Sequence, residues 1–252
     1  MLCAARAQVG PFGQTFWAIV DRGTGEMHER TVKRPPLTRG EVWSERATGG
    51  HWEIGSGEPG VVTLIDAGGV RAALRIGDGK WAETVCPAQG DGERGYVWTR
   101  KRIAPIECDI ALPDGRTFKR AAFGIEDESA GYHPRHTVWS WSAGVGTAAD
   151  GRAVGWNLVS GVNDPPELSE RAIWLDGEPY EPGPVGFDGL AAIDFGDGSR
   201  IDFSAEAERR ASENLGLLRF EYRQPFGTFS GSLDGVELAS AHGVMEHHDA
   251  VW

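Results

Sequence analysis

The dipeptide Asp-Gly recurs along the whole chain and narrows the folds that this sequence can adopt. Asp-Gly readily takes up the positive φ angles of tight hairpin turns. A chain divided this often by hairpin turns predicts antiparallel β-meanders. The dipeptides begin at Asp78, Asp91, Asp114, Asp150, Asp176, Asp188, Asp197 and Asp234.

Short runs of alternating residues lie between these turns, and most of them are rich in β-branched or aromatic side chains. Such runs are typical of half-buried strands. One segment, residues 204–215, is rich in the helix-forming residues Ala, Glu and Arg, yet Phe203, Ala205 and Ala207 alternate as in a strand. Both interpretations of that segment remain open. The alternating runs cover residues 61–66, 70–76, 116–125, 152–160, 189–195 and 199–203.

The length of 252 residues allows one large β domain or two smaller ones. The character of the sequence changes near residues 127–131, because most clustered Trp, His, Asn and Gln residues follow that point. We therefore expect an all-β fold, either two antiparallel β-barrels in tandem or one barrel continued by a sheet. The predicted domains cover residues 1–128 and 129–252.

Composition excludes several classes of partner. The formal net charge is -12, and no block of Lys and Arg could follow a phosphate backbone, so we expect no nucleic-acid partner. The cysteines, Cys3, Cys86 and Cys108, form no Cys-x-x-Cys pair, which favours a reducing compartment. No secretory signal and no apolar run of about 20 residues is present, so the sequence predicts a cytoplasmic protein without a membrane span. Nothing in the sequence indicates the oligomeric state.

A run of polar and aromatic residues marks the first candidate site. If residues 131–143 are extended, alternate side chains share one face of the strand. A barrel wall with that face inward would offer a cation, an imidazole and two indoles to a partly polar ligand. In the alternative interpretation, the Trp pair is barrel core and the Arg is a buried partner of a carboxylate. The shared face carries His133, Arg135, Thr137, Trp139 and Trp141.

The next strand would pair with this run across the turn at Asp150 and bring in Asn157, with Glu170 and Arg171 following. Amides and carboxylates at strand ends often orient a substrate. They also cap turns, and the turn role is favoured for Asn163-Asp164, which precedes two prolines.

Three carboxyl groups are candidates for proton transfer, namely Asp127, Glu170 and Glu246. A carboxylic acid enclosed by indole rings has its charged form desolvated, which raises its pKa and lets it protonate a substrate near neutral pH. A permanent ion pair with Arg135 or Arg171 would lower the pKa instead. The sequence leaves both possibilities open.

Metal and dinucleotide sites are the alternatives for the remaining motifs. Strand geometry sends His133 and His136 to opposite faces, as it does the adjacent His247 and His248, so we predict no metal site. The glycine string that begins at Gly144 leads into a hairpin turn and not a helix, which argues against a dinucleotide. We expect no cofactor.

Six separated motifs also resemble, in order, those of a known family, the actinobacterial branch of the domain of unknown function 2804 family. The resemblance extends from residue 16 to residue 252. Members of this family carry an additional N-terminal segment rich in Arg and Trp, so we expect this chain to start late and its first domain to be short. The motifs are Asp127-x-Ser129-Ala130-Gly131-Tyr132-His133, Arg135-His136-Thr137-x-Trp139-x-Trp141, Gly155-Trp156-Asn157-Leu158, Ser169-Glu170-Arg171-Ala172, Pro225-Phe226-Gly227-x-Phe229-x-Gly231 and Gly243-x-Met245-Glu246-x-His248-x-Ala250-x-Trp252.

The resemblance implies a fold and a class of ligand. The family is similar to the AttH and carotenoid 1,2-hydratase group, whose members resemble two lipocalin-like, calycin-type barrels in tandem. It implies a hydrophobic ligand, an isoprenoid or another lipid, held within or between barrels. Fold by itself does not carry function.

The leading functional hypothesis is a cofactor-independent hydratase, lyase or isomerase. Asp127 or Glu246 would protonate an alkene, and the ring faces of two Trp residues would stabilise the resulting cation. His133 or His248 would position water or remove a proton. The other side chains of these strands are expected to bind the ligand, with Arg135, Asn157 and Gln224 at its polar end. The full set of ligand-binding candidates is Arg135, Thr137, Trp139, Trp141, Asn157, Glu170, Arg171 and Gln224.

Two other functions use the same residues. A non-catalytic carrier or sensor would bind the lipophilic molecule and release it unchanged. A carbohydrate-active protein would need two carboxyl groups about 5 to 10 Å apart across an open cleft. The sequence does not decide whether the protein is an enzyme.

Overall fold

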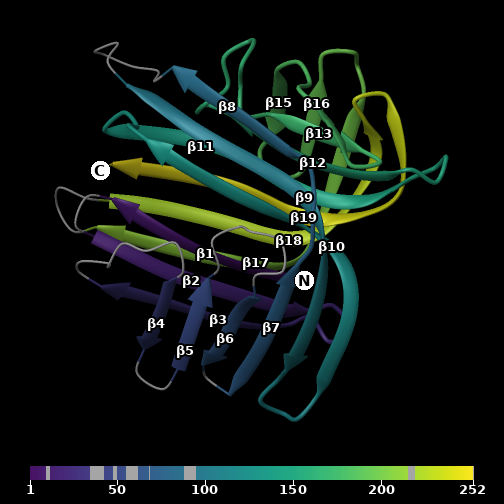
Figure 1. The fold of residues 1–252 in the computed structure, drawn as a ribbon. Helices are drawn as coiled ribbons and strands as arrows, with labels where there is room; N and C mark the ends of the chain where they lie inside the picture. The colour runs from purple at the N-terminus through teal and green to yellow at the C-terminus, as the bar shows by residue number, and fades with distance from the viewer. Residues whose placement is uncertain are drawn as a thin grey trace. The chain divides into compact units, whose positions relative to one another are not determined.

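The computed structural model describes residues 1–9, 12–34, 43–47, 50–54, 62–67, 69–87, 95–214 and 219–251. These residues form β-strands joined by turns and irregular segments, and none of them belongs to a helix (Figure 1). The predicted all-β class is therefore confirmed. No helix in the described ranges has the length and apolar character needed to cross a bilayer.

The chain divides into two compact units, each built from two separate segments. The first unit contains residues 1–79 and 104–124, and the second contains residues 80–103 and 125–252. Two long strands, β9 (Tyr96–Ala111) and β10 (Thr117–Gly131), contribute residues to both units. The domain boundary expected at residue 128 stays a prediction.

The first unit contains two sets of antiparallel strands. Its small apolar core includes Trp17, Ile19, Val70, Ala72 and Leu112, all of them buried. In one set, three consecutive strands pair in chain order, and in the other, β7 pairs with the second half of β9. The strands are β1 (Leu2–Val9), β2 (Phe12–Asp21) and β3 (Glu26–Arg34), and then β4 (Trp43–Ala47), β5 (Gly50–Ile54), β6 (Val62–Ala67) and β7 (Val70–Ile76).

The second unit is dominated by a nine-stranded antiparallel sheet with the order β14-β13-β12-β11-β19-β18-β17-β16-β15. The sheet curls, because β15 at one edge contacts β12 near the other edge. Strand β8 (Trp81–Pro87) pairs with the first half of β9. The strands of the large sheet are β11 (His136–Ala148), β12 (Ala153–Ser160), β13 (Ala172–Leu175), β14 (Glu178–Tyr180), β15 (Val185–Asp188), β16 (Ala192–Phe195), β17 (Arg200–Asn214), β18 (Arg219–Leu233) and β19 (Val236–Val251).

The Asp-Gly dipeptides behave largely as predicted. At six of them the Gly has the positive φ that tight turns require. The dipeptide at Asp91 lies outside the described residues, and Gly79 is not among the residues of positive φ. The six glycines are Gly115, Gly151, Gly177, Gly189, Gly198 and Gly235.

Two local expectations are resolved by strand pairing. Residues 204–214 belong to β17 and pair with β18, so the strand interpretation of that segment is correct. The extended run expected over residues 131–143 is wrong at its start, because residues 132–135 form a loop and β11 begins at His136. Pro134 lies in that loop and has no N–H to donate to a strand ladder.

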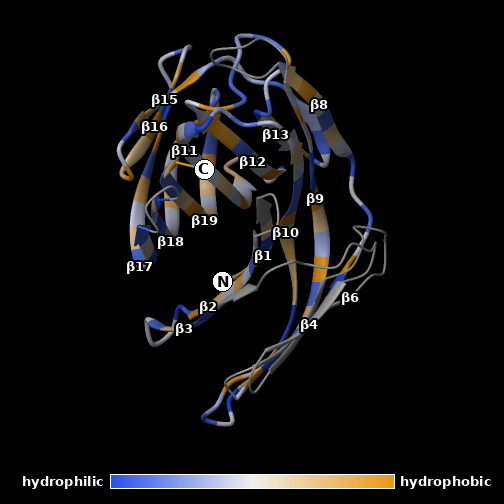
Figure 2. Ribbon diagram, turned by 90° about the vertical axis from the view of Figure 1, so that its left-hand side faces the viewer, coloured by the Kyte–Doolittle hydropathy of each residue, from blue (hydrophilic) through white to orange (hydrophobic). Residues whose placement is uncertain are grey.

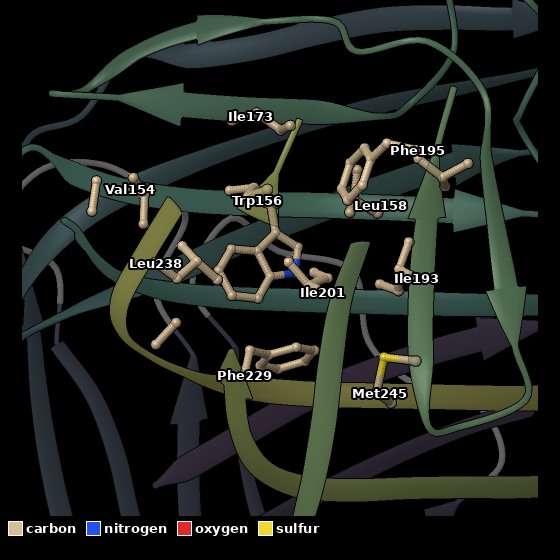
Figure 3. Packing of buried hydrophobic residues seen from close by; sticks show 14 residues of the cluster. Val154, Trp156, Leu158, Ile173, Ile193, Phe195, Ile201, Phe229, Leu238 and Met245 are labelled. Atoms are coloured by element: carbon tan, nitrogen blue, oxygen red, sulfur yellow. The ribbon is translucent and has the colours of Figure 1, made fainter. Parts of the chain in front are cut away.

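The main apolar core fills the inside of the curled sheet. Trp156 and Ile173 are completely buried there, and Phe229 packs edge-on against Trp156 with ring centroids 4.9 Å apart (Figure 3). Hydrophobic and hydrophilic residues alternate along the long strands (Figure 2). Since alternate side chains point to opposite faces, the residues next to Met245 and Trp156 in the sequence face away from this core. The candidate site lies on that second face.

Candidate active site on the second face of the large sheet

Glu246 of β19 lies at the centre of the candidate site. Its side chain is buried, and both carboxyl oxygens accept hydrogen bonds from neighbouring strands. The indole N–H of Trp139 on β11 donates to Oε1 at 2.9 Å, and the amide N–H of Gln224 on β18 donates to Oε2 at 3.0 Å. Strands β11 and β18 flank β19, so three adjacent strands build one group, which we call the Glu246 group.

The pKa of Glu246 is raised toward neutral pH. Burial raises the pKa of its carboxyl group to about 7, although the side chains of Trp139, Tyr222 and Gln224 stabilise the charged form and oppose the shift. The negative charge of Asp127 adds to the increase. Near neutral pH, Glu246 is therefore partly protonated and is able to give a proton to a bound molecule.

His248 lies two residues further along β19 and shares the face of Glu246. Its imidazole stacks at a tilt on Trp139, with ring centroids 4.2 Å apart, and meets the edge of Tyr222 at 5.3 Å. Burial lowers the pKa of His248 to about 4, so the ring is neutral over the physiological range. Between these two pKa values a protonated carboxyl group lies near a neutral imidazole, which is an arrangement of acid and base.

A second polar group extends from β11 and β12. The indole N–H of Trp141 donates to Oδ1 of Asn157 at 2.7 Å, and the Asn157 amide donates to the backbone carbonyl of Glu170 at 2.9 Å. Asn157 is completely buried, and these two hydrogen bonds satisfy the oxygen and the nitrogen of its amide. Trp141 is the register partner of Glu246, so this group adjoins the Glu246 group on the same face.

A buried lysine on β9 holds two of the predicted acids. The Nζ of Lys101, whose side chain is 2% exposed, lies 3.2 Å from Oδ1 of Asp127 and 3.5 Å from Oε2 of Glu170. Burial disfavours the Lys101 ammonium, but the two carboxylates more than offset this, so its pKa is raised. Burial also raises the pKa of Glu170, which accepts a further hydrogen bond from Asn163 at 2.8 Å.

Arg171 has a structural role in the arrangement. Its buried guanidinium donates to the backbone carbonyls of Asp164 at 3.2 Å, Pro165 at 2.9 Å and Pro182 at 3.3 Å. These bonds hold the segment between β12 and β13 that presents Glu170. The ion partner of Asp127 and Glu170 is thus Lys101, and neither of the two arginines expected from the sequence occupies that position.

The remaining predicted residues lie at the entrance to β11. His133 and Arg135 are exposed in the loop 132–135. The described donors to Glu246 are Trp139 and Gln224 instead. The buried hydroxyl of Thr137 donates to the carbonyl of Pro134 at 2.8 Å and closes this loop. His136 faces the other side of the sheet and lies 2.8 Å from Asp249.

Sequence reasoning missed Lys101, and it favoured a turn role for Asn163, whose amide donates to Glu170. A signal was available, because Lys101 and Arg102 follow one another within a strand and adjacent side chains point to opposite faces. Both are buried, and Arg102 pairs with Glu126 at 2.8 Å on its own side. The three consecutive cations Arg100, Lys101 and Arg102 within one strand therefore indicate acidic partners on both faces.

The described residues contain no group of three or more His, Cys, Asp and Glu side chains arranged to hold a metal ion. The groups that the site offers to a bound molecule are an acid at Glu246, a neutral imidazole at His248, two indole rings and two fixed amides.

The fold and the buried polar face define an all-β, lipocalin-like protein. The chain belongs to the family described as Domain of unknown function (DUF2804), whose model matches residues 69–252. The actinobacterial branch stays a prediction. No curated protein matches the sequence.

Solved structures with the same fold include the two described next. An AttH protein from Nitrosomonas europaea is 11% identical with a TM-score of 0.52, and the match covers 98% of this chain and 85% of that one. The kievitone hydratase from Nectria haematococca is 11% identical with a TM-score of 0.51, over 100% of this chain and 83% of that one. At this level of identity the likeness establishes the fold alone.

Proposed function

We propose that this protein binds a hydrophobic small molecule, isoprenoid or lipid-like, at the Glu246 group and catalyses its hydration or isomerisation without a cofactor. The observation that carries the proposal is the buried carboxyl group of Glu246, which is held by two N–H donors and has a pKa of about 7. That one of the similar folds belongs to a protein named kievitone hydratase supports the reaction class.

In the hydration, the π electrons of a substrate alkene take the proton of Glu246 and form a new C–H bond. The adjacent carbon becomes a cation, which the ring faces of Trp139 and Trp141 stabilise. The carboxylate left behind keeps its hydrogen bonds from Trp139 and Gln224. Both bonds favour the charged form, so they assist the proton transfer as it occurs.

Water completes the reaction at the cation. Its oxygen forms the new C–O bond, and neutral His248 takes the proton that the water loses. Transfer of that proton from His248 back to Glu246 restores the starting state, and the net change is alkene plus water to alcohol. In an isomerisation, His248 removes a proton from a neighbouring carbon instead, and the double bond re-forms at a new position.

Lys101, Asp127 and Glu170 form a buried ion cluster, the Lys101 cluster, which supports this chemistry indirectly. It holds Asp127 and Glu170 at fixed positions, and the backbone of Glu170 in turn anchors the amide of Asn157 beneath Trp141. We assign Asp127 to this structural cluster and Glu246 to the acid role, because Asp127 is held in an ion pair with Lys101. His133 and Arg135 have no role in the proposed reaction.

The test replaces Glu246 by Gln, which keeps the shape and removes the acid. Wild type and Glu246→Gln are incubated in ¹⁸O-labelled water with a panel of isoprenoid and lipid alkenes, and products are analysed by mass spectrometry. We expect a labelled alcohol with wild type and a loss of at least about 100-fold with Glu246→Gln. A parallel incubation in D₂O detects isomerisation as deuterium in the product. Turnover should also fall as the pH rises through about 7.

Glu237→Gln is the matched control, because Glu237 lies exposed on the same strand. Its turnover should equal that of wild type. Equal turnover in Glu246→Gln and wild type would exclude Glu246 as the acid. A ligand that co-purifies and is released unchanged, with no product in either solvent, would instead establish the carrier function.

A further inference from the structure

Gln224 has one end of its amide without a partner in the described part of the protein. The residue is 3% exposed, and its Nε2 donates to Glu246. Its Oε1 is buried and accepts no hydrogen bond from any described residue. Buried polar atoms are nearly always paired, and an unpaired one destabilises the structure.

The two indole donors of the site are already engaged. The indole N–H of Trp139 is bound to Glu246, and that of Trp141 is bound to Asn157. Nε2 of Gln224 donates to Glu246, and this bond fixes the orientation of the amide. The amide oxygen at the other end still lacks a donor. A bound molecule that brings an O–H would recover the lost hydrogen bond.

The charges near the site restrict that molecule further. Asp127 acts on Glu246 electrostatically, and Glu170 lies beside Asp127 at the same lysine. The ammonium of Lys101 is already shared by these two carboxylates. The other cation near the amide is the buried Arg209, which is the register partner of Gln224 on β17 and lies 5.1 Å from the ring centroid of Tyr222. A ligand with a carboxylate or phosphate end would have to draw Arg209 away from that ring to find a counter-ion, whereas a hydroxyl group needs none.

We propose that Gln224 is a specificity-determining residue whose Oε1 accepts a hydrogen bond from an uncharged hydroxyl group of the ligand, an alcohol or a phenol. Since Oε1 is covered in this structure, ligand entry displaces a side chain at the Glu246 group. Trp139 and His248 are the partly buried side chains of that group, and the proposed entry shifts one of them. The inference rests on the ligand site of the proposed function, but it does not depend on turnover.

Binding of defined probes tests the proposal. Geraniol, its methyl ether and geranate share one apolar chain and differ in the polar end, and 1-naphthol with its methyl ether provides a second scaffold. Isothermal titration should give wild-type affinities about tenfold higher for each hydroxyl compound than for its ether, with geranate weakest. Gln224→Met removes the acceptor at similar size and should bring the ratio of alcohol to ether affinity to about one.

Glu221→Met is the matched control, because Glu221 lies exposed on the same strand as Gln224 and outside the Glu246 group. The tenfold preference should survive in this variant. The proposal is overturned if the ethers bind wild type as tightly as the alcohols, or if Gln224→Met retains the preference. It is also overturned if geranate binds most tightly or if neither hydroxyl compound binds. The wild-type comparison alone decides if Gln224→Met does not fold. A hydroxyl preference without any Glu246-dependent product would leave this inference standing and refute the catalytic one.

Discussion

Glu246 and His248 show how one strand can give two ionisable side chains opposite protonation preferences. They lie two residues apart on the same face of β19, and burial acts on both. Burial disfavours whichever form is charged, so the pKa of the carboxyl group rises and that of the imidazole falls. Each group is therefore uncharged at mildly acidic pH, which suits an apolar ligand and leaves a proton available at Glu246.

The raised pKa of Glu246 makes folding stability depend on pH. The ordinary pKa is 4.5 and the folded value is about 7, so the stabilising preference for the protonated form is complete below 4.5 and is lost as the pH rises through about 7. The difference corresponds to about 3 kcal/mol. We expect Glu246→Gln to gain stability relative to wild type by this order between about pH 4.5 and pH 8, measured by urea unfolding. A constant difference across that range would contradict the burial of an ionising carboxyl group.

At the scale of elements, the approach of β9 to β12 depends on the missing side chain of Gly155. A Cβ atom at Gly155 would lie 1.7 Å from Cδ1 of Ile103, far inside any allowed contact. Gly155 and Asn157 share a face of β12. The contact between β9 and β12 therefore lies on the same face of β12 as the Asn157 side chain.

Gly155→Ala should destabilise the fold by roughly 1 to 3 kcal/mol, because the added methyl group displaces Ile103. Thermal or urea unfolding measures the change. Gly186→Ala is the control, since a Cβ at that position meets no atom within 4 Å. Adding Ile103→Val should restore part of the loss, and two variants of equal stability at positions 155 and 186 would refute the contact.

The pairing of β9 with its acidic neighbours makes a second element-scale prediction. Lys101→Met leaves Asp127 and Glu170 without their buried counter-ion, and we expect a loss of about 3 to 5 kcal/mol in unfolding free energy. Glu170→Gln in the same chain should recover a substantial part, because it removes one uncompensated charge. Lys80→Met is the control, and the exposed pair of Lys80 with Glu178 should cost at most about 1 kcal/mol. Equal effects of the two lysine variants would show that Lys101 is not a buried counter-ion.

At the scale of the whole molecule, local rules account for much of the fold and for part of the site. The Asp-Gly turns and the alternation between them predict an all-β chain, and alternation also places Thr137, Trp139 and Trp141 on one face. Glu246 was identified because it is a carboxyl group among aromatic residues. The loop 132–135 interrupts this regularity, and the structure leaves His133 and Arg135 exposed there.

The sequence by itself determined several of the strands, most of the Asp-Gly turns and the side chains that share a face, because these depend on backbone dihedral preferences and on a two-residue period. Only the tertiary structure decided which faces meet, because that depends on strand order and on the curl of the sheet. It joined Trp139, Gln224 and Glu246 across three strands and brought Lys101 to Asp127 and Glu170. These contacts set the burial of each group, and burial is what raises the pKa of Glu246 and lowers that of His248.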